Sequence, residues 1–205
     1  MQLSHRPVVN PKDVDIKVEG QPAFFEGPMV SSKQKRAIST GELPSAYRYL
    51  HDFSYADLEL PEEKRKAIGR MLASSFRSGD PPEKIAPRLL KETGGKFSCA
   101  PLSNFMKSNH GSRFVKNYSV DSVADVCFLY IHTRFFEAEN YEELNRLKVV
   151  ASGISPAIGI MIVNVPGECT QCNAVKLTYT WSEVEAIPTL PRHWGCRCVY
   201  ELWIA

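Results

Sequence analysis

Features that would assign a chain to a membrane, exported or repetitive class are missing from this sequence. It has no run of about 18 or more apolar residues, so it predicts no transmembrane helix. The first residues, Met-Gln-Leu-Ser-His-Arg-Pro, lack the apolar core of a secretory signal, and we expect no export by that route. Internal repeats and low-complexity tracts are absent too. With 43% hydrophobic and 23% charged residues, the 205-residue chain has the composition of a globular protein with a real core.

The motifs of several large enzyme classes are also missing. The sequence contains no G-x-x-x-x-G-K-[ST] phosphate loop, no G-x-S-x-G nucleophile turn and no H-E-x-x-H zinc motif. A zinc deaminase would need His-x-Glu or Cys-x-Glu upstream of Cys169-x-x-Cys172. None of His110, His132 and Cys127 is followed two residues later by Glu, so the deaminase interpretation fails. No small-molecule substrate is indicated.

Six cysteines are present, and four of them lie close together near the C-terminus. A Cys-x-x-Cys turn can place two thiolates on one metal, and a later hairpin can supply the other ligands of a tetrahedron. Five candidate ligands compete for four places: Cys169, Cys172, His193, Cys196 and Cys198. We expect a structural Zn²⁺ site formed by the first three and one of the last two. A redox or disulfide arrangement and unbound buried thiols are the alternatives.

The middle of the chain is predicted to be helical. Pro61-Glu62-Glu63 is a favourable helix start, and apolar residues recur at helical spacing from there to about Ser78. The turn Gly79-Asp80-Pro81-Pro82 starts a second helix, which Pro87 is expected to shorten or kink. Residues 96–118 have no clear period, and no element is predicted there.

A long helix and a β-rich ending follow. The helical stripe runs from Asp121 to Gly153, and a helix of that length is expected to break near Glu139-Asn140. Three strands are predicted after it, at Ile158–Val165, Val175–Trp181 and Cys198–Ile204. The expected fold class is therefore α+β, with a helical middle region followed by a small β-rich module clipped by zinc.

Three regions are expected along the chain. Residues 1–57 are interrupted by prolines and predict an extended N-terminal arm, with a short strand near Asp15–Val18 and a helical turn near Ser45–Asp52. Residues 58–152 form the basic helical region, and residues 153–205 form the β-rich Cys/His metal-binding module.

The net charge of +2 hides an asymmetry along the chain. Residues 61–120 hold twelve basic residues against five acidic ones, whereas residues 151–205 hold three against four. Because clustered cations attract phosphate backbones, we expect the middle region to be the part that contacts double-stranded DNA. A solvated helix face explains part of this charge equally well. The candidate contacts are Lys64, Arg65, Lys66, Arg70, Arg77, Lys107, Arg113 and Lys116.

The C-terminal part resembles the signature of a known family. Cys169-Thr-Gln-Cys172, followed by Pro191-Arg-His193-Trp-Gly-Cys196-Arg-Cys198, is similar to the C-x-x-C and P-x-H-x-x-C-R-C pattern of the phage Mu F-like head-morphogenesis family. The upstream region resembles the family in the order of its helices, over residues 61–205 in all. The family's Arg-Thr-Glu triplet is His132-Thr133-Arg134 here.

The resemblance implies a function as well as a fold. It indicates a non-enzymatic minor head protein of a phage or prophage, which acts in capsid or portal assembly and in DNA packaging or delivery. The implied partners are portal or capsid proteins, and the implied location is the virion or the host cytoplasm. No catalytic residue is implied.

Two alternatives come from other classes of protein. Mu F-like modules are often joined to effector domains, and Glu183-x-Glu185 resembles the paired glutamates of Arg-specific ADP-ribosyltransferases. The second alternative is a free-standing zinc protein that binds nucleic acid, although the acidic balance of the zinc module argues against it.

Overall fold

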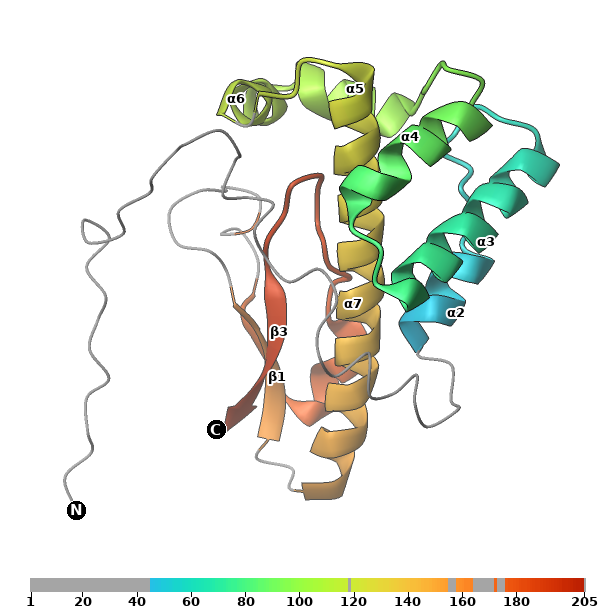
Figure 1. Ribbon diagram of the computed structural model, residues 1–205. Helices are drawn as coiled ribbons and strands as arrows, with labels where there is room; N and C mark the ends of the chain where they lie inside the picture. The colour runs from blue at the N-terminus through green and yellow to red at the C-terminus, as the bar shows by residue number, and fades with distance from the viewer. Residues whose placement is uncertain (1–44, 118, 155–157, 164–171, 173–175, 205) are drawn as a thin grey trace.

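The computed structural model describes residues 45–117, 119–154, 158–163, 172 and 176–204. Its axis is one long helix, α7 (Val123–Ile154), with helices on one side and a small sheet on the other (Figure 1). The predicted α+β fold class is confirmed, since a helical middle region leads into a three-stranded antiparallel sheet. Cys169 and the strand expected near residues 15–18 lie outside the described residues.

The helices of the middle region start and stop at the residues that favour those ends. Helix α3 follows Pro61, carries Glu62 and Glu63 in its first turn, and ends at Gly79 in the left-handed conformation with φ 71°. The helices that precede α7 are α2 (Ser45–Asp52), α3 (Glu62–Ser78), α4 (Pro82–Glu92), α5 (Ala100–Lys107) and α6 (Asn109–Asn117).

Two expectations about the helices need correction. Two helices, α5 and α6, occupy the region in which no element was predicted, because short helices show too few turns to display a period. The second helix, α4, is short as expected, with 11 residues and Pro87 inside it. The predicted break near Glu139-Asn140 is wrong, since α7 continues for 32 residues. The buried Asn140 amide donates to the Phe136 carbonyl at 2.9 Å, so this polar side chain is satisfied within the helix.

The sheet has the strand order β2-β1-β3. Strand β1 (Ile158–Val163) pairs antiparallel with both β2 (Thr178–Tyr179) and β3 (Val199–Ile204). The strand expected over residues 175–181 is short in the part that is described, because a 3₁₀ helix, η2 (Trp181–Ala186), begins at Trp181.

Two hydrophobic clusters hold these elements together. The first lies among the helices and includes Leu50, Tyr55, Ile68 and Phe135, and the second joins α7 to the sheet. The described end of the predicted arm is not extended, because α2 packs on α3 and α7, and Tyr55 is fully buried. None of the described helices is long and apolar enough to cross a bilayer.

Candidate metal centre

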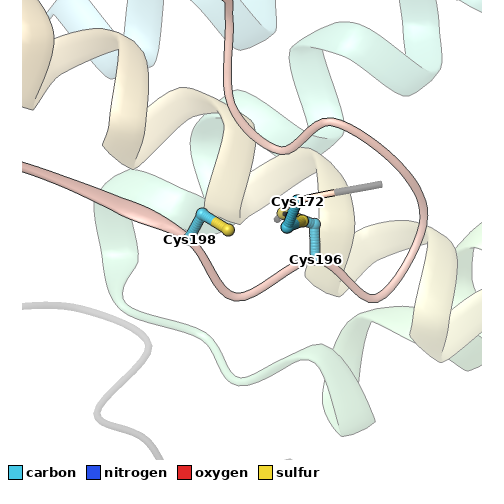
Figure 2. Close-up of side chains that lie close together, drawn as sticks. All are labelled: Cys172, Cys196 and Cys198. Carbon is cyan, nitrogen blue, oxygen red and sulfur yellow. Dashed lines mark hydrogen bonds between the residues drawn. The ribbon is translucent and has the colours of Figure 1, made fainter. Parts of the chain in front are cut away.

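Three cysteine side chains converge where the C-terminal loop enters β3. Cys172, Cys196 and Cys198 are all buried, and their sulfur atoms lie within 4.8 Å of one another. Figure 2 shows the sulfur of Cys198 pointing toward the other two. A turn brings Cys196 back, since its N–H donates to the His193 carbonyl at 3.0 Å. Residues separated by more than twenty positions therefore form one thiol cluster.

The separation between two of the sulfurs fits a tetrahedral metal. Zinc–sulfur bonds of about 2.3 Å and zinc–nitrogen bonds of about 2.0 Å place neighbouring ligand atoms about 3.5 to 3.8 Å apart. The sulfurs of Cys172 and Cys196 are 3.6 Å apart, within this range, whereas Nε2 of His193 is closer to the Cys172 sulfur, at 3.2 Å. A cluster of three buried thiols is a donor set that can hold a metal such as zinc.

The histidine ring has the tautomer that a metal ligand bound through Nε2 requires. Its Nδ1 lies 2.8 Å from the Trp194 carbonyl, and a carbonyl accepts only from a protonated nitrogen. This bond leaves the lone pair of Nε2 directed toward the Cys172 sulfur. A second hydrogen bond that fixes the tautomer is the usual support of a ligating histidine. Phe105 of α5 stacks on the same ring, with centroids 6.3 Å apart.

The structure places both Cys196 and Cys198 in the cluster, which differs from the sequence-based expectation. Only one of Cys196 and Cys198 was expected to join the site, but both sulfurs lie in the cluster. Alternate residues of an extended segment point to the same side, which explains how Cys-x-Cys delivers two thiols. Together with Cys172 they form a cluster of three thiols, and His193 contacts the Cys172 member of that cluster.

The described cysteines are all free thiols. The 3.6 Å between the sulfurs of Cys172 and Cys196 far exceeds the about 2.05 Å of a disulfide bond. Cys99 and Cys127 lie apart from this cluster in the helical core. Burial raises the pKa of each of these two thiols to about 12, so both are protonated and unreactive at neutral pH.

The loop of residues 187–198, between η2 and β3, carries three of the candidate ligands and is termed the metal loop; it also packs against the helical core. Trp194, next to His193, stacks on Tyr130 of α7 with centroids 5.7 Å apart. The guanidinium of Arg134 lies 5.0 Å from the centre of the same indole. Sequence analysis missed this contact, and the tryptophan beside a candidate ligand was the signal that could have revealed it.

Arg134 itself is held by two carboxylates. Its side chain is 8% exposed, and it pairs with Asp57 at 2.7 Å and with Glu137 at 2.5 Å. Tyr130 donates to the second oxygen of Asp57 at 3.1 Å. A buried cation needs such partners. Through Asp57 on one side and Trp194 on the other, Arg134 therefore holds the loop around residue 57 and the metal loop to the same face of α7.

The glutamate pair of the effector alternative has structural contacts. Glu183 forms a capping box with Thr180 at the start of η2 and an ion pair with Lys176. These contacts lower the pKa of Glu183 to about 2, the bond from Lys176 having the largest effect. Glu185 has an 88% exposed side chain and pairs with Lys148 at 3.4 Å.

The candidate DNA contacts do not form one patch. Four of the side chains project from α3 into solvent, and three others are exposed on α5 and α6, which lie at a different end of the molecule (Figure 1). Arg65 is partly buried and donates to the Ser54 carbonyl at 3.4 Å. The four on α3 are Lys64, Lys66, Arg70 and Arg77, and the three others are Lys107, Arg113 and Lys116.

Comparisons with protein families, with curated proteins and with solved structures found no match to this chain.

Proposed function

We propose that the protein is a non-enzymatic head-morphogenesis protein of the Mu F-like kind, whose C-terminal module is folded around a structural zinc ion. The observation that supports the metal site is the convergence of three buried cysteines, Cys172, Cys196 and Cys198. His193 lies beside this cluster, with Nε2 3.2 Å from the Cys172 sulfur, and is proposed as the fourth ligand. The assembly part rests on the resemblance of the same residues to the family signature. Its partners are the portal or capsid proteins of the phage or prophage that encodes it.

A structural role for the metal follows from the number and burial of its ligands. Catalytic zinc sites use three protein ligands and leave one position open for water, whereas structural sites are closed by four. Here three thiols are buried, and the imidazole of His193, which lies 3.2 Å from one of them, is the proposed fourth ligand. When bound, zinc contributes folding free energy, on the order of 10 kcal/mol in small zinc domains.

The position of the ligands explains what the metal stabilises. Cys172 precedes β2, Cys196 and Cys198 precede β3, and β2 and β3 flank β1. A metal bound by all three cysteines therefore joins both edges of the sheet at one end. The sheet is only three strands wide, and such a small module needs this kind of cross-link to stay folded.

Metal analysis of the purified full-length chain tests the zinc site. We expect close to one zinc per chain, and Cys172→Ser should lose most of it. Cys127→Ala is the matched control, because Cys127 is equally buried but lies among the helices, and it should keep its zinc. A wild-type chain without zinc, or equal zinc in both variants, contradicts the proposal.

The assembly role is tested in the phage or prophage that carries the gene. After induction, purified particles should contain the chain as a minor component, and a strain with Cys196→Ser should produce fewer particles filled with DNA. Particles that lack the chain and assemble normally without it would rule out the head-protein role.

A further inference from the structure

Two clefts meet at the C-terminal end of α2. The first lies between α2 and α7 and has a volume of about 620 Å³, and the second lies between α2 and α3 and has a volume of about 400 Å³. Both are lined by Asp52, Phe53 and Ser54, so they are two parts of one groove that bends around this turn. The groove lies on the helical side of the molecule and is separate from the cysteine cluster.

The second cleft has more basic than acidic side chains in its lining: Arg65, Lys66 and Arg70 against Asp52 and Glu62. Lys66 is paired with Glu62 at 2.7 Å, but among the described residues no carboxylate pairs with Arg65 or Arg70. In the first cleft, Arg48 likewise has no carboxylate partner among the described residues. These three guanidinium groups give the groove an excess of positive charge, which suits a ligand with several phosphates.

The first cleft is lined by aromatic rings. Tyr141 of α7 is 44% exposed and lies with its ring centre 5.0 Å from that of Tyr49, which is 5.7 Å from Phe53. The guanidinium of Arg134 sits 4.6 Å from the centre of the Phe53 ring and holds it in place from the protein interior. The result is a fixed row of rings that ends in an exposed one.

We propose that this groove binds single-stranded nucleic acid. The guanidinium groups contact phosphates, and an unstacked base stacks on the exposed face of Tyr141. Cationic grooves lined with aromatic rings are suited to single strands, because every base has a π-face and successive phosphates follow the charge. A duplex keeps its bases stacked inside, so it has no free base face to offer Tyr141. This site involves α2 and α7 as well as α3, and it does not depend on the proposed role of the zinc module.

Fluorescence anisotropy with a labelled oligo-thymidine single strand, at several salt concentrations, tests the site on the full zinc-loaded chain. Tyr141→Ala is expected to weaken binding about fivefold or more, as loss of one stacked base does, whereas Tyr141→Phe keeps the ring and the affinity. Arg70→Ala is expected to weaken binding and to lower the slope of log affinity against log salt by about 0.7, the value for one phosphate contact of a single strand.

The control variant removes an equal charge elsewhere. Lys91→Ala changes an exposed cation on α4, outside the groove, and should leave both affinity and salt slope within twofold of the wild type. A blunt duplex of the same length should bind more weakly and should not respond to Tyr141→Ala. No binding of the single strand, equal losses for Arg70→Ala and Lys91→Ala, or indifference to Tyr141→Ala overturns the proposal.

Discussion

Replacing Trp194 by alanine tests whether the metal loop and the helical core are one energetic unit. The substitution removes the stack on Tyr130 and the contact with the Arg134 guanidinium. An aromatic pair contributes about 0.5–1.5 kcal/mol beyond its buried area, and a partly desolvated cation–π contact contributes about 1 kcal/mol. Since the indole is only partly buried, we expect a total cost of about 2 kcal/mol in the metal-loaded protein.

The same substitution should cost much less when the metal is removed. The indole is next to His193 in the chain, and a bond to the proposed metal would fix the His193 ring. Without that bond the loop is free to leave α7, so the contacts of Trp194 are lost in the wild type as well. We expect the cost of Trp194→Ala to fall below about 0.5 kcal/mol after chelation, and this difference is the coupling free energy between metal and core.

Urea unfolding of wild type and Trp194→Ala, each with zinc and with a chelator, gives the four free energies of the cycle. Trp203→Ala is the control, because this partly buried tryptophan lies on β3 and has no recorded ring contact with Tyr130 or Arg134 among the described residues. Hydrogen exchange should show loss of protection near Tyr130 for Trp194→Ala but not for Trp203→Ala. An equal cost of Trp194→Ala with and without zinc would refute the coupling.

Three further substitutions test the helical core by urea or thermal unfolding. Arg134→Met leaves two carboxylates without their cation and should cost about 3–5 kcal/mol, and a cost under about 1 kcal/mol would contradict the network. Gly69→Ala should destabilise the protein despite the better helix propensity of alanine. The new Cβ would lie 2.9 Å from the Tyr55 ring and 3.3 Å from the His51 carbonyl oxygen. A gain in stability would show that the helices can separate. Burial, assisted by the charge of Arg197, lowers the pKa of His132 to about 4. As the pH falls, the imidazole is therefore protonated in the unfolded chain before it is protonated in the folded one. The free energy of unfolding should fall by up to about 3 kcal/mol between about pH 6.5 and pH 4. His132→Phe should flatten that part of the pH profile relative to wild type, and an unchanged profile would contradict the assignment.

The sequence predicted those parts of the fold whose signals are local. Helix α3 has a proline before it, acids in its first turn and a glycine after its last, and each of these residues acts within one turn of the chain. Strands β1 and β3 are short apolar runs bounded by turns, and their bounds agree with the prediction to within about two residues.

Features that depend on tertiary contacts were not predictable in the same way. The length of α7 looked excessive for one helix, but the helical cluster at one end and the sheet at the other both pack against it and support it along its length. The burial of Arg134 cannot be inferred from its neighbours in sequence, because Asp57 lies 77 residues away. The candidate metal ligands were recognisable from their spacing, yet only the backbone path decides that both Cys196 and Cys198 face the cluster.

X-ray absorption spectroscopy at the zinc edge of the full-length, zinc-loaded chain tests the central claim most directly. The proposed ligands predict three sulfurs at about 2.3 Å and one imidazole nitrogen at about 2.0 Å. His193→Ala should remove the imidazole scattering and leave the three sulfurs. Four sulfurs in the wild type would mean that Cys169 takes the place of His193, and a shell of mostly oxygen or nitrogen would contradict a zinc centre built on the three buried cysteines.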